Sequence, residues 1–430
     1  MSNISVENRL KQLFDERTGN SRLDNVLGDL RMGAIATVVL QGIPSKKAEN
    51  YRYTDIRAIY ESQQSVVSCA QADNGCQTEC LPVESECFKM CNGCMVSHQK
   101  LVETQQGVIL GSLAEAADRY PYLVGEYLNR ATDSKNTIEA INTAFVQDGF
   151  FLYVPKDVEV EQHISIRDSY CAANSAMTFS RALVIMEPNA KATVIFDTHS
   201  ECENQMANNS LREFFVKDGA KLNIIDIQRV SNNSANICST EVLQGQDSQV
   251  KSVSLTLDGG VVRNDWRVKL NGRGADNKTL GLALSGENQH IDYYTDIEHL
   301  CSDATSQQKF KSTAAANGQV VFNGRIYVPQ DAQRTQAFQE NRNLLLSDTA
   351  NIYAKPQLEI YADDVKCSHG ATVGQLNAEE IYYMRQRGIS EVEAKRLQVY
   401  GFFNEIISQV ADENLVEYLN KLAETKIERL

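Results

Sequence analysis

The chain has no run of apolar residues close to the ~18 that a membrane-spanning helix needs. Residues 1–19 are polar and helical in character, without the apolar stretch of a signal peptide. We therefore expect a cytoplasmic protein with no membrane partner. Thiols stay reduced in that compartment, so the 11 cysteines are expected to be thiols or metal ligands rather than disulfides.

Basic residues are in deficit, because 42 Lys and Arg stand against 56 Asp and Glu, for a net charge of −14. A protein this acidic repels the phosphate backbone of nucleic acids, and no basic patch interleaved with aromatic residues offsets the charge. Nucleic acid is therefore excluded as an expected partner.

Common sequence motifs of nucleotide-binding and hydrolytic enzymes are missing as well. There is no Gly-x4-Gly-Lys-Ser/Thr segment, so we expect this chain to bind no nucleotide in that way. Neither a Gly-x-Ser-x-Gly elbow nor a His-Glu-x-x-His pair occurs. A carbohydrate-active β-helix enzyme would need paired carboxylates on adjacent coils, and no convincing set is found. These absences favour a non-catalytic subunit whose energy comes from a partner.

From about residue 145 the sequence contains a repeat of β-rich runs. Residues 189–195 (NAKATVI) and 219–225 (GAKLNII) are thirty positions apart, and weaker copies begin near residues 248, 275, 318 and 349. One such unit cannot bury its apolar face alone, whereas stacked units share a continuous core. A period near thirty without intervening helices favours a parallel β-helix with two or three short strands per coil. A β-sandwich with coincidental turn similarity is the alternative.

Helical patterns flank this region and set the expected organisation. They cover residues 5–42 and 113–128 at the front, and three segments after Gln375 at the end. We expect an N-terminal helical region (1–140) with a Cys-rich insert (about 66–105), a β-helix core (141–374) and a C-terminal helical domain (375–430). The apolar residues of that last domain suggest either a docking face or simple packing between helices.

Two segments carry a resemblance to a known family. They are the run PQLEIYADDVKCSHGAT at 356–372, continued by EEIYYMRQRGI at 379–389 and Gly401-Phe402-Phe403, and the run GIPSKKAENYRYTD at 42–55. With these segments the chain resembles the SufB/SufD family of iron–sulfur cluster assembly proteins. The residues Cys-Ser-His-Gly at 367–370 are similar to the SufD type rather than the SufB type.

The resemblance implies a mainly β fold, a right-handed parallel β-helix flanked by N-terminal and C-terminal α-helical regions. It implies a SufD-like subunit of a SufBCD complex, which supports cluster assembly and iron acquisition together with SufB and the ATPase SufC. A SufB-like subunit would pair through the β-helices, and isolated chains would form homodimers in the same way. SufC would dock on the C-terminal helices, where we expect contacts from Tyr400, Phe402, Phe403 and Ile406. The alternative within the family is a SufB-like scaffold that carries the cluster itself.

Cys367 and His369 are the candidate ligands for that cluster. Alternate residues of a strand share a face, so both side chains are expected to point the same way. A thiolate and an imidazole suit iron, but two ligands alone cannot hold a cluster. The pair would therefore serve a transient cluster completed by the SufB partner. The structural alternative is a buried Cys beside a hydrogen-bonded His.

The Cys-rich insert offers a second candidate site. Six cysteines fall within residues 69–94, and the end of the cluster reads Cys87-x3-Cys91-x2-Cys94-x3-His98. This spacing is dense enough for zinc or an iron–sulfur cluster. The first three cysteines also match the radical-SAM motif, although no barrel pattern surrounds them. An unliganded loop is the remaining interpretation.

Overall fold

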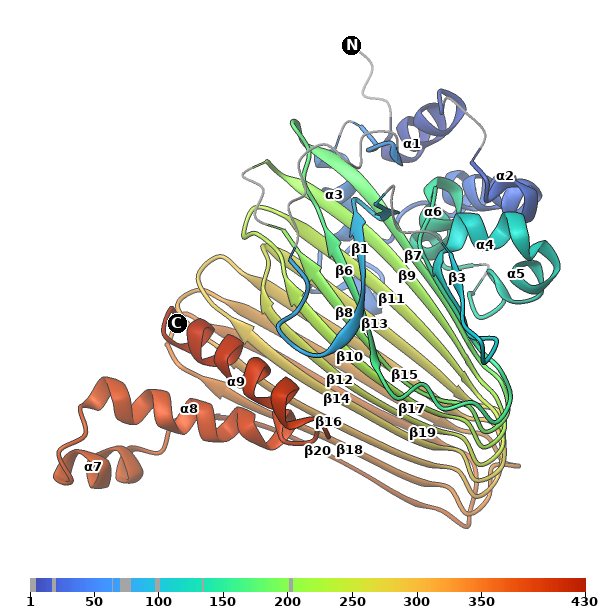
Figure 1. Cartoon of the computed structure of the whole chain (residues 1–430). Helices are drawn as coiled ribbons and strands as arrows, with labels where there is room; N and C mark the ends of the chain where they lie inside the picture. Colours follow the sequence, from blue (N-terminus) through green and yellow to red (C-terminus); the bar gives the residue numbers. More distant parts are fainter. Residues whose placement is uncertain are drawn as a thin grey trace.

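A computed structural model describes residues 5–17, 21–63, 65–69, 79–96, 101–133, 135–200 and 204–430. Two ten-stranded sheets wind together as a parallel β-solenoid, and helices flank it on both sides (Figure 1). The mainly β architecture predicted from the sequence is confirmed. No helix in these ranges is long and apolar enough to span a membrane.

Sheet B has the strand order β2-β1-β6-β8-β10-β12-β14-β16-β18-β20, and only its β1–β2 pair is antiparallel. The Cys-rich insert thus supplies the first strands of this sheet. Its strands are β1 (Ser85–Cys91), β2 (Cys94–Met95), β6 (His163–Ser169), β8 (Lys191–His199), β10 (Lys221–Arg229), β12 (Gln249–Asp258), β14 (Asp276–Ser285), β16 (Thr305–Ala314), β18 (Gln336–Leu345) and β20 (Lys366–Gln375).

Sheet A has the order β19-β17-β15-β13-β11-β9-β7-β5-β4-β3 and is parallel from β5 to β19. Each full coil therefore consists of one long strand from each sheet. Its strands are β3 (Val102–Glu103), β4 (Ile109–Ser112), β5 (Phe150–Val154), β7 (Ala176–Met186), β9 (Met206–Val216), β11 (Ala235–Gln244), β13 (Val261–Leu270), β15 (His290–His299), β17 (Gln319–Val328) and β19 (Asn351–Ile360).

The turns that precede the strands of sheet B explain the sequence repeat. Asn189, Gly219, Asp247 and Gly274 each lie two residues before a strand and have φ between 52° and 71°. Gly, Asn and Asp adopt this left-handed conformation most easily. The copies near residues 318 and 349 belong to a different turn, which precedes β17 and β19 of sheet A. The repeat in the sequence thus combines two stacked turns of one solenoid.

Three apolar layers hold the molecule together. The interior between the sheets contains buried aromatic side chains such as Trp266, Phe310 and Phe322. The outer face of sheet A is covered by N-terminal helices, whose Ile35 and Ile141 pack with Ile237. These helices are α1 (Val6–Asp15), α2 (Asp24–Gln41), α3 (Ile56–Ser62), α4 (Leu113–Arg119), α5 (Pro121–Tyr127) and α6 (Thr137–Phe145), with a short 3-10 turn, η1 (Glu49–Tyr51).

The outer face of sheet B is covered by the C-terminal helices α8 (Glu391–Ile407) and α9 (Glu413–Ile427), whereas α7 (Ala378–Gln386) packs against α8. Two local features separate α7 from α8: Gly388 has φ 87° after the first helix, and the Ser390 hydroxyl accepts a hydrogen bond from the Glu393 N–H at 3.2 Å at the start of the next. Lys426 of α9 is buried and donates to Asp258 at 2.9 Å, which anchors the last helix to sheet B.

Candidate functional site at the open end of the solenoid

Strands β19 and β20 form the last coil, and each is the edge strand of its sheet. Within the described chain, β19 pairs only with β17 and β20 only with β18. Most side chains of this coil are half-buried or exposed, whereas alternate residues of β18 are buried. Edge strands present unpaired N–H and C=O groups that another chain can extend. The solenoid therefore ends open and ready for a partner strand.

Cys367 and His369 lie on β20 at this open end. They are in register with Ala337 and Gln339 of β18, which are 0% and 3% exposed and face the solenoid interior. The ladder therefore places both residues on the inner face, Cys367 half-buried against the core and His369 exposed. Burial raises the pKa of the Cys367 thiol. The pair thus borders the mouth of the interior, and its role as a ligand set stays a prediction.

A buried column of carboxamides leads inward from His369. Gln308 of β16 and Gln339 of β18 occupy the two preceding rungs. Thr295 donates a hydrogen bond to Gln308 Oε1 at 2.6 Å, and Gln339 Nε2 donates to the same oxygen at 3.4 Å. Among the described residues, Gln339 Oε1 and Gln308 Nε2 have no hydrogen-bond partner. A buried amide atom without a hydrogen-bond partner costs roughly 1–3 kcal/mol of stability, so this end of the interior is suited to bind a polar ligand.

Gly324 makes room for that column. A Cβ at this position would lie 2.3 Å from Gln339 Nε2 and 2.9 Å from the Thr295 hydroxyl. Sequence reasoning missed Gln308 and Gln339, because single glutamines in strand-like runs look like solvent-facing residues. Their spacing of 31 residues, one coil of the solenoid, was the available signal.

The acidic turn before β20 does not orient the imidazole. Asp363 and Asp364 are exposed, and the Asp364 backbone N–H donates to Gln333 Oε1 at 2.9 Å. Within the described ranges, no hydrogen bond joins either carboxylate to His369. The two aspartates form a solvated turn.

The four residues chosen as a docking surface lie on α8. Phe403 and Ile406 are fully buried against sheet B, whereas Tyr400 and Phe402 are half-buried. Lys311 donates to the Phe402 carbonyl at 2.9 Å, and its Nζ lies 4.4 Å from the Phe402 ring centroid. The prediction of an exposed face at Phe403 and Ile406 is therefore wrong, because these side chains attach the helix to the solenoid.

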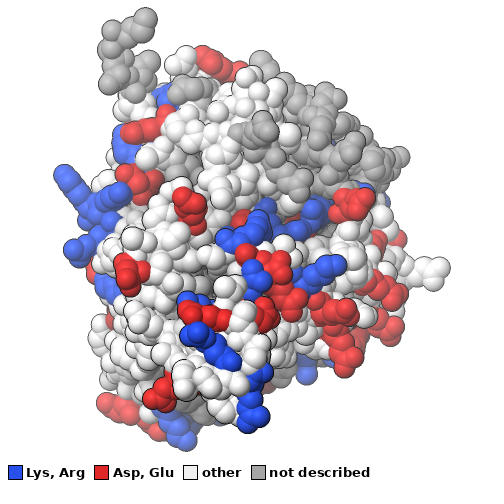
Figure 2. All heavy atoms as spheres, turned by 90° about the vertical axis from the view of Figure 1, so that its left-hand side faces the viewer, with Lys and Arg blue, Asp and Glu red and all other residues white. Residues whose placement is uncertain are grey.

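Other apolar side chains of the C-terminal helices are exposed instead. Tyr382 and Tyr383 of α7 are 63% and 60% exposed, and Val392 and Leu397 of α8 are 62% and 42% exposed. Helix α7 has no buried residue and projects from the body of the molecule (Figure 1). The side of the molecule that carries these helices mixes Lys and Arg with Asp and Glu (Figure 2). The unpartnered surface of this domain therefore lies on α7 and the start of α8.

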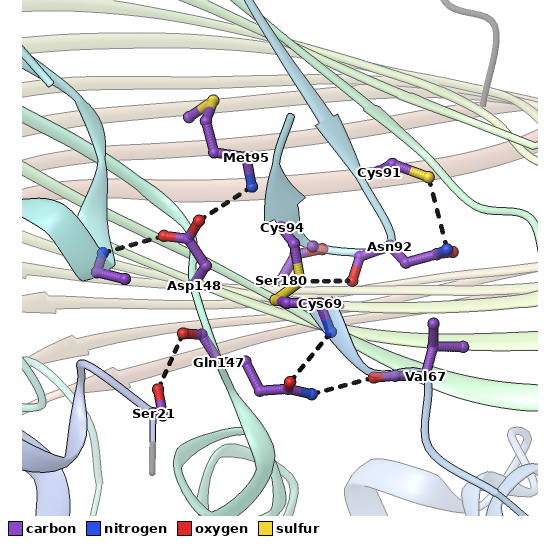
Figure 3. The surroundings of a disulfide bond; sticks show 12 residues. Ser21, Val67, Cys69, Cys91, Asn92, Cys94, Met95, Gln147, Asp148 and Ser180 are labelled. Carbon is purple, nitrogen blue, oxygen red and sulfur yellow. Dashed lines mark hydrogen bonds between the residues drawn. A yellow bond between two sulfur atoms is a disulfide. The ribbon is translucent and has the colours of Figure 1, made fainter. Parts of the chain in front are cut away.

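The Cys-rich insert lies at the opposite end of sheet B and contains disulfides. Cys69 is bonded to Cys94 (Figure 3), and Cys80 is bonded to Cys87. Cys91 is disulfide-bonded as well. The expectation of reduced thiols is wrong for these residues. Since Cys87, Cys91 and Cys94 are all bonded, none is a free metal ligand in this state, and His98 lies outside the described residues.

Comparison with known proteins decides the family. The SufBD core domain of the SUF system for FeS cluster assembly matches residues 169–402, and the SufBD N-terminal region matches residues 4–166. The chain belongs to the SufB/SufD family.

Named relatives refine this assignment. The chain is 29% identical to the iron–sulfur cluster assembly protein SufD of Escherichia coli, over 87% of each chain. It is 27% identical to SufD of Bacillus subtilis, over 75% of this chain and 74% of the relative. It is also 27% identical to a SufBD family protein of Synechocystis, over 94% of this chain and 92% of the relative. These relatives make it a SufD-like member of the SufB/SufD family.

The two family matches place the two ends of the solenoid in different regions of the family. The core match runs from the end of β6 through β20 and into α8, so it includes Cys367 and His369. The N-terminal match covers the helices on sheet A together with the Cys-rich insert. In this SufB/SufD member the open coil therefore belongs to the core and the disulfides to the N-terminal region.

Proposed function

We propose that this chain is the SufD-like subunit of a SufBCD-type complex in the cytoplasm, where it supports iron–sulfur cluster assembly and iron acquisition. The observation that carries the proposal is the position of Cys367 and His369 on the inner face of an open terminal coil. Thiolate and imidazole are suitable donors for iron, and they lie where a second solenoid would extend the sheets.

The cluster is cargo in this proposal and is bound only transiently. Two donors leave most coordination positions of the iron atoms empty, so a SufB-like partner supplies the rest. The carboxamide column below His369 provides polar groups for hydrated iron or sulfide near the pair. Without the SufB-like partner, the same edges join two copies of this chain.

The exposed side chains of α7 and the start of α8 are the proposed contact for a SufC-like ATPase. Tyr382 and Tyr383 have the amphipathic character that is enriched at protein interfaces. Because α8 packs firmly on sheet B, movement of a bound ATPase would be transmitted to the solenoid. ATP hydrolysis belongs to that partner, and this chain contributes structure and ligands.

Co-expression with SufB-like and SufC-like partners, followed by affinity purification and sizing, tests the proposal. We expect one stable complex of all three chains, with iron and sulfide bound. The SufB-like alternative predicts instead that the isolated chain, reconstituted anaerobically with iron and sulfide, holds a stoichiometric cluster. Failure to bind either partner would reject the proposed function.

A further inference from the structure

The β1–β2 hairpin at the disulfide-bonded end brings two cysteines face to face. Cys91 and Cys94 are directly paired across a two-residue turn, Asn92–Gly93, whose φ angles are 54° and 80°. Positive φ at both residues is what a tight two-residue hairpin requires. The Asn92 N–H donates to the Ser169 carbonyl at 2.8 Å. The two cysteines are therefore presented on a preformed turn held against the solenoid.

The backbone of Gly93 is held in place by neighbouring strands. Its N–H donates to Asp168 Oδ1 at 3.2 Å, and a Cβ there would lie 2.3 Å from the Phe179 carbonyl oxygen. The hairpin is thus fixed by contacts with neighbouring strands as well as by its own geometry.

Cys69 contributes a third sulfur from a different segment. Its N–H donates to Gln147 Oε1 at 3.1 Å, and Gln147 Nε2 donates to the Val67 carbonyl at 3.0 Å (Figure 3). Cys69 packs against Cys91 and Cys94, and its Cα lies 5.5 Å from that of Cys94. Cys91 and Cys94 are 1% and 4% exposed, whereas Cys69 is half-buried.

We propose that Cys69, Cys91 and Cys94, once reduced, form a thiolate site for Zn²⁺. A Cys-x2-Cys pair on a tight turn with one more cysteine nearby is a common zinc ligand set. Thiolates on one tetrahedral zinc lie about 3.8 Å apart, since each Zn–S bond is about 2.3 Å. Side-chain rotation after disulfide cleavage is the movement that would bring the three sulfurs to that separation. A cavity of about 290 Å³ lined by Cys69 and Cys94 leaves the fourth position to water or a solute ligand.

This set differs from the one suggested by sequence spacing, which included Cys87. Cys87 lies four residues before Cys91 on the extended strand β1, which separates their Cα atoms by about 13 Å. One ion cannot bind both. Cys69, which is remote in sequence, takes that place.

The cysteines of this site can form disulfides or bind a metal ion, but they cannot do both at once. In the disulfide-bonded state, the described residues contain no group of three His, Cys, Asp or Glu side chains arranged to hold a metal. A dithiol reductant cleaves both the bond between Cys69 and Cys94 and the disulfide of Cys91 by exchange, and each cleavage yields two thiols and one oxidised reductant. Zn²⁺ then displaces three thiol protons as it binds. This inference is independent of the function proposed for the other end of the solenoid.

Cobalt substitution tests the site in the full chain. After anaerobic reduction, Co²⁺ should give the intense visible and thiolate charge-transfer bands of a tetrahedral thiolate complex, at one ion per chain, and Zn²⁺ should bleach them. In C69S, C91S and C94S the charge-transfer intensity should fall by about a third or more, since one of three thiolates is lost. C87S and C301S are matched controls and should keep the full signal.

Differential alkylation supplies a readout that needs no variant. Zn²⁺ should protect Cys69, Cys91 and Cys94 of the reduced wild-type chain from iodoacetamide, while Cys301 stays reactive. Absence of the cobalt bands, equal loss in C87S and C69S, or protection that does not include Cys69 would overturn the proposal.

Discussion

His369 occupies the rung of the sheet B ladder directly above Gln339, and Gln339 lies directly above Gln308. An exposed imidazole thus continues a column of buried carboxamides to the open end of the solenoid. This relationship links the thiol–imidazole pair to the polar interior and leads to the first prediction.

Replacing His369 with Ala should impair cluster delivery to apo-acceptor proteins while the complex still assembles. The His369 side chain is exposed and forms no hydrogen bond with any residue that the structure describes, so its loss removes a ligand without removing packing. Transfer to an apo-ferredoxin, followed by visible absorption, measures the effect. Ser368→Ala, on the opposite face of the same strand, is the control, and normal delivery by H369A would show that the imidazole is structural.

The free edge of β20 should be sensitive to the loss of outward-pointing N–H groups. Lys366 donates to Thr335 on the β18 side, and donors alternate along a strand, so the N–H of Val373 points to the free edge and that of Thr372 to β18. Val373→Pro should therefore weaken pairing with a second solenoid and leave the fold intact.

Sizing of co-expressed subunits measures that pairing. Val373→Ala keeps the N–H and should pair normally, whereas Thr372→Pro should lower the thermal midpoint because it breaks the internal ladder. Unchanged pairing in V373P would place the interface elsewhere.

Substitutions of exposed and of buried residues in the C-terminal helices should affect different properties, the first ATPase binding and the second stability. Tyr382→Ala with Tyr383→Ala should weaken ATPase binding about tenfold or more with little effect on stability, since both side chains are exposed. Phe403→Ala should cost about 3–5 kcal/mol of unfolding free energy, because its ring is fully buried. Binding isotherms and urea denaturation separate the two effects. Full ATPase affinity in the double tyrosine variant would move the docking surface away from α7.

His299 should make the fold sensitive to mild acid. Burial lowers its pKa from 6.5 to about 4. Between these values the unfolded chain binds a proton that the folded chain does not, so stability falls as pH drops from about 6.5 to 4. The loss at this group is about 3 kcal/mol. Urea denaturation of wild type and His299→Gln across this range should show a shallower pH dependence in the variant, and parallel curves would contradict the assignment.

Local signals predicted much of this fold. The helix end at Gly42 and the repeated turns that begin at Asn189 and Gly219 depend on residues a few positions apart, which sequence patterns report directly. The repeat predicted stacking but not that its copies mix turns of both sheets, since the two turns have similar composition.

Long-range packing explains the remaining differences. An apolar helix face such as that of Phe403 and Ile406 can be a core or a docking surface, and the sequence alone cannot say which face meets sheet B. Likewise, Cys69 meets Cys94 only because the insert joins sheet B as strands β1 and β2, a pairing that no local motif encodes.

Metal analysis of the assembled three-chain complex tests the role of the terminal coil most directly. Iron and acid-labile sulfide should be measured per complex for wild type and for the double variant Cys367→Ser, His369→Ala, purified without oxygen and matched for subunit composition. We predict a wild-type complex with bound iron and sulfide, and a double variant that assembles equally well but holds little of either. A double variant with wild-type iron and sulfide content would contradict the claim that these two side chains complete the cluster site.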